Sequence, residues 1–414
     1  MNILFLSLGE FGDLSQSSVH IDIMKRFAEE HNVFLVCKSE RRLQQETRVS
    51  EEYGINVLRV RTGNLKKTSI LEKGISTLLV KPQFLKAIKK YFGNVKFDLI
   101  LYETPPITFA NVVKTIKKRD NAKTYLMLKD IFPQNAVDIG MLSKRGVKGL
   151  AYRYFRHQEE KLYKVSDYIG CMSEANVKYV LKNNPYLDSS VVEICPNTIN
   201  AKDMSSDSTT LEIIRKKYEI PRDKMVFVYG GNLGKPQGIP FLIECLKEFN
   251  RMQREEKVGT LSKAFILIIG SGTEYNRIKD YIDMEKPDNI RLMTSLPGSD
   301  YNAMVGACDV GMLFLDHRFT IPNFPSRILS YMQAKLPVLA VTDPNTDVGE
   351  VVTDGGFGWW CESNSVASFM ATIQAICKLS ETELKQRGEM GWNFLIKEYS
   401  VNNAYNAIIN HMSK

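Results

Sequence analysis

Short apolar runs and helical patterns alternate twice along this chain, and this alternation constrains the fold more than any other feature of its 414 residues. In the first half, helical patterns such as 20–30, 107–118 and 150–165 separate the apolar runs. These strand-like runs are 3–8, 33–37, 55–60, 99–102, 124–128, 168–172 and 191–195. Such alternation is typical of a parallel, doubly wound sheet. We therefore predict an α/β, Rossmann-like domain over residues 1–200.

The second half repeats this architecture, with strand-like runs at 225–229, 265–269, 290–293, 310–315 and 337–341. A break at 196–200 and the polar segment 205–210 place a linker near residue 200. The length suits two domains of about 200 residues. We predict a second Rossmann-like domain over 201–391, and a last helical segment, about 392–414, that packs back onto the first domain.

Ligands of doubly wound sheets bind outside the carboxyl ends of the strands. We therefore expect the site in a central cleft that the two domains face. A periplasmic binding protein or a sugar-nucleotide epimerase would fit the same architecture, so the fold alone does not name the chemistry.

Composition narrows the class of protein and its compartment. A hydrophobic content of 44% and a charged content of 25% are those of a globular protein in water. The longest apolar runs, such as 264–269, fall short of the ~20 residues that a membrane helix needs. The first residues lack the basic region of a signal peptide, and the seven cysteines form no Cys-x-x-Cys pair. We expect a cytoplasmic protein without disulfides or structural zinc.

Charge is distributed unevenly between the halves. Residues 1–200 hold 31 Lys and Arg against 21 Asp and Glu, whereas residues 201–414 hold 24 against 26. An excess of +10 in the first half predicts an anionic partner for that half. Nucleic acid is not expected, because the chain has no Arg-rich tract or recognised nucleic-acid motif. The five histidines show no metal-ligand spacing and no Asp-x-Asp occurs, so we expect no metal and no other cofactor.

A glycine-rich loop, Tyr-Gly-Gly-Asn-Leu-Gly-Lys-Pro-Gln-Gly at 229–238, follows a predicted strand and opens a helix. Its glycines let the backbone approach a ligand closely, and Lys235 supplies a charge that attracts phosphate. A glycine-rich turn with a solvated lysine is the alternative. A second Gly-x-Gly, at Gly270 and Gly272, follows another strand and is equally compatible with a simple turn.

The stretch 323–341 indicates a tight loop, a short amphipathic helix and a buried strand. We expect Pro325 in the first helical turn and Lys335 in the last turn, against the negative end of the helix. The free N–H groups of the helix start, at Ser326 and Arg327, would suit a diphosphate. An ordinary helix–strand corner is the alternative.

Two patterns carry a family resemblance. Pro-Ser-Arg-x-x-x-Tyr-Met-x-Ala-x-x-Pro-Val at 325–338 and Gly-Asn-Leu-Gly-x-x-Gln-Gly at 231–238 resemble loops of family 4 glycosyltransferases. The match is to their bacterial surface-polysaccharide or O-antigen branch, which includes fucosamine-transferase-type enzymes. The resemblance implies the GT-B fold, a nucleoside-diphosphate sugar as donor, and transfer with retention. The first loop would hold the diphosphate and the ribose of the donor.

The resemblance also implies roles for individual residues. Asn232 and Gln237 stand where the wider family has an Arg and a Lys. Lys235 and Arg327 would therefore be the catalytic cations that neutralise the charge of the donor phosphates. The family's pair of glutamates falls on Pro322 and Ser330, neither of which is a carboxylate, and Ser330 would offer one hydrogen bond to the ribose. The implied donor-binding residues are Gly12, Asn232, Gly234, Gln237, Gly238, Gly270, Gly272, Thr294, Asn323, Phe324, Ser326 and Ser330.

The acceptor side is expected in the first domain. Asp130 lies in Asp-Ile-Phe-Pro, which resembles a motif of this branch, and at a strand end it would bind the acceptor hydroxyl or take its proton. A helix N-cap followed by Pro133 is the alternative. Glu103 and His20 are weaker acceptor candidates, and a solvated or helix-capping role fits His20 too. The loop that carries Gly12 lacks the Gly-x-Gly-x-x-Gly spacing, so a nicotinamide dinucleotide is not expected.

The segment 82–92 is short, basic and amphipathic, and Lys66, Lys67, Lys73 and Lys81 precede it. Such segments can lie in a membrane interface, although a surface helix that covers the sheet is as common. The positive first half and the lipid-linked acceptors that the resemblance implies favour peripheral contact with an anionic membrane.

The prediction is a retaining, hexosyltransferase-like glycosyltransferase at the cytoplasmic face of the membrane, active in capsule or O-antigen biosynthesis. It would use a UDP-sugar in preference to other donors, and a glycan on a polyprenyl diphosphate as acceptor. A catalytically silent sugar-nucleotide-binding subunit is the alternative that the missing glutamates favour. A UDP-sugar epimerase or hydrolase on the same fold is the other.

Overall fold

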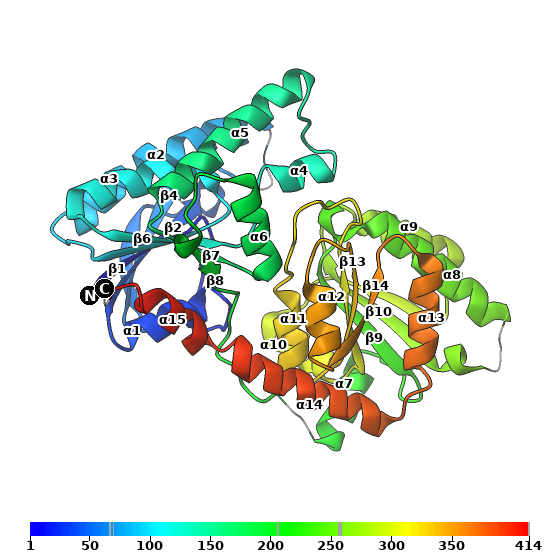
Figure 1. Cartoon of the computed structure of the whole chain (residues 1–414). Coiled ribbons are helices and arrows are strands. Elements are labelled where there is room, and N and C mark those ends of the chain that lie inside the picture. Colours follow the sequence, from blue (N-terminus) through cyan, green and yellow to red (C-terminus); the bar gives the residue numbers. More distant parts are fainter. Residues whose placement is uncertain (66–67, 69, 205–206, 256–258, 413–414) are drawn as a thin grey trace. The chain divides into compact units, whose positions relative to one another are not determined.

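The computed structural model describes residues 1–65, 68, 70–204, 207–255 and 259–412. The chain forms two compact units: the N-terminal unit, Met1–Asn200 with Ser400–Lys414, and the C-terminal unit, Ala201–Tyr399 (Figure 1). The return to the N-terminal unit begins at Ser400 and not at the predicted residue 392, because 392–398 belong to helix α14 (Glu381–Glu398) of the C-terminal unit. Residues 205 and 206 of the predicted linker lie outside the described residues.

The N-terminal unit is built on an eight-stranded sheet of order β3-β4-β2-β1-β5-β6-β7-β8. The strands are β1 (Asn2–Leu6), β2 (Asn32–Glu40), β3 (Arg48–Glu52), β4 (Ile55–Thr62), β5 (Leu99–Glu103), β6 (Lys123–Leu128), β7 (Tyr168–Cys171) and β8 (Val192–Ile194). All seven predicted runs are strands, and β3 was missed. Strand β3 pairs antiparallel with β4 across a turn at Tyr53 and Gly54, both with positive φ. Its charged, exposed residues are typical of an edge strand.

Helices cover both faces of this sheet. They are α1 (Ile21–Ala28), α2 (Ile70–Phe92), α3 (Ala110–Asp120), α4 (Gln134–Asp138), α5 (Gly146–Val165), α6 (Glu174–Asn183) and α15 (Val401–Ile409). Helix α15 lies beside α1 (Figure 1) and buries Tyr405 and Ile408 in the core with Phe27. The Tyr405 and Phe27 rings lie 4.9 Å apart. The predicted return of the chain end is therefore part of the N-terminal core.

The basic segment 82–92 is the second half of α2, and its apolar face packs inward. Phe84, Ile88 and Phe92 are buried, whereas Lys86 and Lys89 are exposed. The segment is therefore a surface helix whose apolar residues serve the core of the protein. Lys66 and Lys67, which extended this basic region in the sequence, lie outside the described residues.

The C-terminal unit is built on a six-stranded parallel sheet of order β11-β10-β9-β12-β13-β14. The strands are β9 (Met225–Asn232), β10 (Ala264–Ser271), β11 (Ile290–Met293), β12 (Val310–Phe314), β13 (Val338–Thr342) and β14 (Gly358–Glu362). All five predicted runs are strands, and β14 was missed. The helices are α7 (Ser208–Lys217), α8 (Ile239–Glu255), α9 (Tyr275–Glu285), α10 (Gly298–Gly306), α11 (Arg327–Gln333), α12 (Val348–Asp354), α13 (Val366–Ile376) and α14.

Each sheet has a point at which the chain reverses its winding direction. In the N-terminal unit the chain builds outward from β1 to β2 and β4, and then returns to place β5 on the other side of β1. In the C-terminal unit it builds from β9 to β10 and β11, and then places β12 on the other side of β9. Ligands bind outside the carboxyl ends of the strands at such points. A candidate site is therefore expected at these strand ends in each unit.

None of the helices in the described residues is both long and apolar enough to cross a membrane. In the same part of the chain, no three His, Cys, Asp or Glu side chains are placed to hold a metal ion.

Candidate nucleotide-sugar site and the polar cluster of the N-terminal unit

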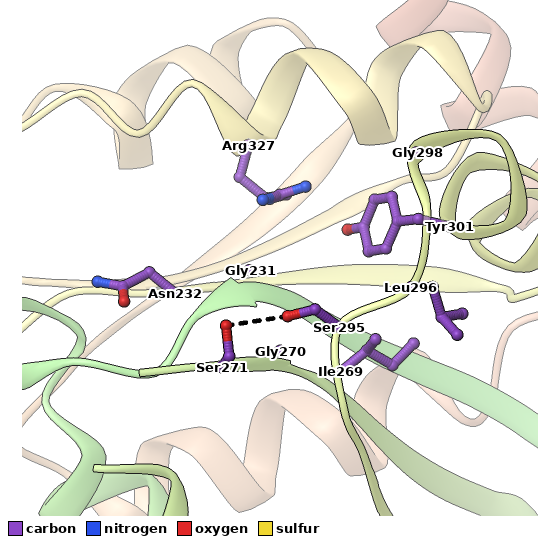
Figure 2. A pocket seen from close by; sticks show the side chains of 10 residues that line it. All are labelled: Gly231, Asn232, Ile269, Gly270, Ser271, Ser295, Leu296, Gly298, Tyr301 and Arg327. Carbon is purple, nitrogen blue, oxygen red and sulfur yellow. Dashed lines mark hydrogen bonds between the residues drawn. The ribbon is translucent and has the colours of Figure 1, made fainter. Parts of the chain in front are cut away.

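A pocket of 380 Å³ lies at the carboxyl ends of β9 and β10 in the C-terminal unit (Figure 2). It is lined by residues from both strand ends, from the loop after β11, and from the first turns of α10 and α11. These residues are Gly231, Asn232, Ile269, Gly270, Ser271, Ser295, Leu296, Gly298, Tyr301 and Arg327. The predicted residues Asn232, Gly270 and Arg327 are thus brought together.

Glycines at the two strand ends create the floor of the pocket. A Cβ atom on Gly270 would lie 1.9 Å from the carbonyl oxygen of Gly231, so only glycine lets the two strands approach this closely. Gly231 has φ +136°, and a Cβ atom there would lie 2.8 Å from Nη2 of Arg327. Because Gly231 has no side chain, the Arg327 guanidinium can lie against its backbone.

We expect Gly270→Ala to lower the free energy of unfolding by about 1–3 kcal/mol, because a backbone carbonyl must move to admit the methyl group. Gly298→Ala is the matched control. Gly298 lines the same pocket, but a Cβ atom there meets nothing within 4 Å. Urea unfolding of both variants checks this, and equal stability of the two would contradict the close approach of the strands.

Arg327 and Tyr301 form one wall of the pocket, and two serine hydroxyls form the opposite wall (Figure 2). The guanidinium carbon of Arg327 lies 5.0 Å from the centre of the Tyr301 ring, within the range of a cation–π contact. Ser271 and Ser295 hydrogen-bond each other through their hydroxyls at 3.0 Å. Burial raises the pKa of Tyr301, against the opposing effect of Arg327. The Tyr301 side chain is therefore a neutral phenol.

Arg327 has no carboxylate partner among the residues that the structure describes. Most buried or half-buried arginines of this chain do have one; Arg59, for example, pairs with Glu52. A cation without a counter-charge, beside open backbone, is suited to an anion such as a phosphate.

The start and the end of α11 differ from the prediction. The helix begins at Arg327 with Ser326 as its N-cap, so Pro325 precedes the helix instead of lying in its first turn. The helix ends at Gln333, and Lys335 lies beyond it with φ +54°. Lys335 forms ion pairs with Asp203 at 3.1 Å and with Glu389 at 3.0 Å. These carboxylates, and not the end of the helix, compensate its charge.

The loop 232–238 is shaped by its own side chains. The Gln237 Oε1 atom accepts hydrogen bonds from Asn232 Nδ2 at 3.0 Å and from the Gly234 N–H at 3.2 Å. Gly238 has φ +59° and closes the turn. Gln237, Gly234 and Gly238 therefore hold the loop and do not line the pocket. Lys235 is exposed on the same loop.

Several predicted donor residues lie near the pocket without lining it. Gly272 packs against the Leu233 backbone, where a Cβ atom would lie 2.3 Å from a carbonyl oxygen. The carbonyl oxygen of Asn323 accepts a hydrogen bond from Thr346 Oγ1 at 2.5 Å, and the Phe324 and Tyr399 rings lie 6.0 Å apart. Thr294, Ser326 and Ser330 are also absent from the lining. Tyr301 was not among the predicted residues, because no local pattern indicates which face of α10 meets the pocket.

A second polar cluster lies in the N-terminal unit at the carboxyl ends of β1, β5 and β6, which are adjacent in the sheet. Glu103 accepts a hydrogen bond from Ser7 Oγ at 2.6 Å. Its other oxygen pairs with His20 Nδ1 at 2.7 Å and with Lys129 Nζ at 3.0 Å. Burial raises the pKa of Glu103, but Lys129, His20 and Ser7 outweigh it and lower the pKa to about 2.

This geometry corrects the expectation for Glu103. The residue is only 5% exposed; one carboxylate oxygen accepts the Ser7 hydrogen bond, and the other, which has no hydrogen-bond partner among the described residues, lies in ion-pair contact with His20 and Lys129. It is therefore not free to contact an acceptor directly. Lys129 and Ser7, for which the sequence predicted no role, are the missed members of this cluster.

Asp130 follows Lys129 at the end of β6. Its two carboxylate oxygens accept hydrogen bonds from Asn135 Nδ2 at 2.7 and 2.8 Å. Burial raises the pKa of Asp130 to about 6, although Asn135 and the Ile131 backbone oppose the shift. Pro133 is the N-cap of α4, so the N-cap alternative for Asp130 is wrong. Gly12 lies in a loop held by Arg59, which donates from Nη2 to the Gly12 carbonyl at 3.0 Å.

Solved structures identify the fold. The Anabaena protein Alr3699/HepE in complex with UDP and glucose is similar with a TM-score of 0.70 and 14% identity, covering 100% of this chain and 99% of that one. A trehalose-6-phosphate protein from E. coli bound with UDP-2-fluoro glucose is similar with a TM-score of 0.75 and 11% identity, covering 100% and 99%. WaaG, a glycosyltransferase involved in lipopolysaccharide biosynthesis, is similar with a TM-score of 0.65 and 12% identity, covering 98% of each chain. The chain has the predicted GT-B fold of two Rossmann-like units.

Sequence comparison adds a family match within the C-terminal unit. Residues 211–390, which include the whole pocket lining, match the model of glycosyl transferases group 1. The probable glycosyltransferase WbjE of Pseudomonas aeruginosa is 25% identical over 342 residues, which cover 81% of this chain and 78% of that protein.

Proposed function

We propose that the protein is a glycosyltransferase that uses a nucleoside-diphosphate sugar, with UDP as the nucleotide. The observation that carries the proposal is the pocket at the β9–β10 strand ends, in which the Arg327 cation faces open backbone without a carboxylate partner in the described residues. The match of residues 211–390 to glycosyl transferases group 1 supports the reaction class. The UDP held by one structure of the same fold and the UDP-sugar held by another support the choice of nucleotide.

In the proposed reaction, the bond between the anomeric carbon and the diphosphate oxygen breaks while the acceptor oxygen bonds to that carbon. Arg327 and Lys235 offset the charge that develops on the leaving diphosphate. The Ser330 hydroxyl is assigned to the ribose, and Thr294, Asn323, Phe324, Ser326 and Gly12 to further donor contacts. From the family resemblance we also propose transfer with retention. The acceptor then attacks from the same face that the diphosphate leaves, and the leaving phosphate helps to remove the acceptor proton. This assignment needs no metal ion or other cofactor.

Saturation-transfer NMR against a panel of UDP-, GDP- and dTDP-sugars tests the proposal. We expect binding of UDP-sugars and release of UDP once membrane extract supplies an acceptor. Binding of no member by the folded protein would overturn the proposal. Binding without turnover in any extract would favour the catalytically silent subunit. The absence of carboxylates at Pro322 and Ser330 also favours that alternative. Turnover of the donor without acceptor would favour an epimerase or hydrolase.

The proposed acceptor is a polyprenyl-diphosphate-linked glycan of capsule or O-antigen biosynthesis, oriented by Asp130. The similarity to WaaG, a glycosyltransferase involved in lipopolysaccharide biosynthesis, supports a surface-polysaccharide setting. The carboxylate form of Asp130 accepts the hydrogen bond of a hydroxyl group more strongly than the protonated form does.

Activity is therefore expected to fall as the pH drops through about 6, where Asp130 gains a proton. Asn135→Ala removes two hydrogen bonds that favour the charged form, so it raises the pKa and moves the acid limb of the rate profile upward by about one pH unit. Initial transfer rates from pH 5 to 8 measure this. Asn111→Ala, an exposed site on α3, is the control and should leave the limb in place; an unmoved limb in Asn135→Ala would contradict the role of Asp130.

The proposed membrane contact lies on two helices of the N-terminal unit. On α5, Val147 (86% exposed), Leu150 (61%) and Tyr154 recur at helical spacing and so share one exposed face. Lys144, Arg145, Lys148 and Arg153 are exposed around them. On α2, Ile75, Leu78 and Leu79 form a similar exposed stripe. Apolar side chains ringed by basic ones suit the surface of an anionic membrane. The proposed location is thus peripheral, at the cytoplasmic face.

Leu150→Asp is expected to weaken binding to phosphatidylglycerol-containing vesicles at least about tenfold. An inserted leucine contributes about 1.5–3 kcal/mol, and the new negative charge is repelled by the lipid. Vesicle co-sedimentation measures the change. Ile213→Asp is the matched control, because Ile213 is 63% exposed but lies in the C-terminal unit; equal loss in both variants would contradict a docking face on α5.

A further inference from the structure

Arg327 lies against an aromatic ring in the pocket, where a carboxylate would be the more usual partner of an arginine. Its guanidinium carbon lies over the Tyr301 ring, 5.0 Å from the ring centre, and the two side chains point toward one another (Figure 2). The described residues that line the pocket include no Asp or Glu. The ring is therefore placed to hold a cation whose charge no acidic residue of the lining neutralises.

The other arginines that lie over aromatic rings differ from Arg327 in one respect. Each of the four others in the described residues also has a carboxylate or a carbonyl partner within the protein. They are Arg26, Arg119 and Arg291, which pair with carboxylates, and Arg387, which donates to the Gly356 carbonyl. Among the described residues, Arg327 alone of the five has no carboxylate or carbonyl partner. Its contact with the ring is thus not an accessory to an ion pair.

Two successive glycines at the end of β9 make room for the pair. A Cβ atom on Gly230 would lie 2.1 Å from the Tyr301 hydroxyl oxygen, and one on Gly231 would lie 2.8 Å from Nη2 of Arg327. The ring comes from α10 and the guanidinium from the first residue of α11. Both groups therefore rest against the backbone of one strand end, although they come from different helices.

An aromatic ring can hold an arginine without using its hydrogen-bond donors. A cation–π contact is made by the face of the planar guanidinium, whereas its N–H groups point outward in the plane. A carboxylate engages these N–H groups and neutralises the charge, as Asp316 does with Arg318 through hydrogen bonds of 2.8 and 2.7 Å. The Tyr301 ring therefore leaves the charge and the N–H groups of Arg327 available to an anion.

The hydroxyl group of Tyr301 has no comparable role. It is buried and has no hydrogen-bond partner among the described residues. A buried polar group without a partner lowers stability, so its removal in Tyr301→Phe is expected to leave the ring in place without weakening the fold. The ring is the part of Tyr301 that can act on Arg327.

We propose that Tyr301 is a positioning residue whose ring holds the Arg327 guanidinium so that its N–H groups face the diphosphate of the donor. The proposal rests on the proposed function for the identity of the anion. Tyr301 acts through Arg327 and makes no hydrogen bond to the diphosphate itself. An aromatic partner suits this task because it fixes the cation and leaves its charge to the ligand.

Side-chain NMR on protein labelled with ¹⁵N-arginine tests the positioning without any ligand. A proton held over the face of an aromatic ring resonates at a shifted frequency, and Arg327→Lys identifies the Nε–H signal of Arg327 by its disappearance. We expect the shifted signal in the wild type and in Tyr301→Phe, and its loss of shift in Tyr301→Leu. The same signal position in the wild type and in Tyr301→Leu would overturn the positioning role.

Isothermal titration with UDP tests the consequence for the diphosphate. We expect Tyr301→Leu to weaken UDP binding about tenfold, within the range of a cation–π contact, and Tyr301→Phe to bind within about twofold of the wild type. In the Arg327→Ala background, Tyr301→Leu should change the affinity by less than about twofold, because no guanidinium is left to position. Trp359→Leu, which removes the ring beneath Arg387 in the same unit, is the control and should leave the affinity unchanged.

The outcomes separate this proposal from the proposed function. Equal losses on Tyr301→Leu with and without Arg327 would show that the ring acts on the fold or on the nucleotide itself, and would overturn the positioning role. A loss in Tyr301→Phe as large as in Tyr301→Leu would assign the role to the hydroxyl group and would overturn it too. Absence of UDP binding by the folded wild type would overturn the proposed function and the role toward a diphosphate. The NMR signal would still decide whether Tyr301 holds Arg327.

Discussion

Replacing Arg327 with alanine is expected to weaken UDP-sugar binding about 10- to 100-fold, as measured by isothermal titration. Its guanidinium is the cation of the pocket, it lies against Gly231, and it has no carboxylate partner among the described residues. A hydrogen bond to a charged group contributes about 1.5–3 kcal/mol. Because a bound diphosphate would be the counter-charge, removing the guanidinium removes this contribution without leaving a carboxylate unpaired.

Two further variants sharpen this result. Arg327→Lys is expected to give an intermediate loss, since an ammonium is a point charge that cannot bind phosphate with two parallel hydrogen bonds. Arg254→Ala removes the same charge from the exposed end of α8 and controls for net charge. Unchanged affinity in Arg327→Ala, or an equal loss in Arg254→Ala, would show that the pocket cation does not hold the donor.

Replacing Glu103 with glutamine is expected to lower the free energy of unfolding at pH 7 by about 3 kcal/mol. The carboxylate is buried between Lys129 and His20, and the variant leaves the Lys129 ammonium enclosed without its counter-charge. Loss of one member of a buried ion pair costs about 3–5 kcal/mol. The lowered pKa of Glu103, about 2, corresponds to a similar magnitude. Urea unfolding measures the difference.

The pH dependence of this difference has a definite sign. A carboxylate whose pKa is lowered by folding stabilises the protein fully above its unfolded pKa of about 4.5, and the contribution disappears as the pH falls toward about 2. The stability gap between wild type and Glu103→Gln should therefore narrow below about pH 4.5. Glu51→Gln, at an exposed site on β3, should show almost no gap. A gap independent of pH would contradict the ionised, paired state of Glu103.

Local patterns were sufficient to predict most of the strands and the topology class. Strands buried on both faces, such as β9 and β10, appear as continuous apolar runs because neither face meets water. Strands β3 and β14 escaped prediction for the same reason: β3 is polar at a sheet edge, and three of the five residues of β14 are partly or fully exposed. The sequence left two roles open for the basic segment 82–92, because periodicity does not reveal whether an apolar face packs on lipid or on the core.

The sequence by itself determined two Rossmann-like units, the linker near residue 200, and the strand-end loops that carry Asn232, Gly270 and Arg327. These features can be predicted because each depends on residues that are close together in the sequence. Glycine marks a close approach of the backbone, proline marks a break, and an apolar run marks a buried strand. Tertiary structure alone decided which side chains meet. Ser7, Glu103 and Lys129 come together because β5 lies between β1 and β6 in the sheet, although 96 residues separate Ser7 from Glu103. Tyr301 reaches Arg327 in the same way, because helix packing sets the direction of each side chain and no local sequence signal specifies it.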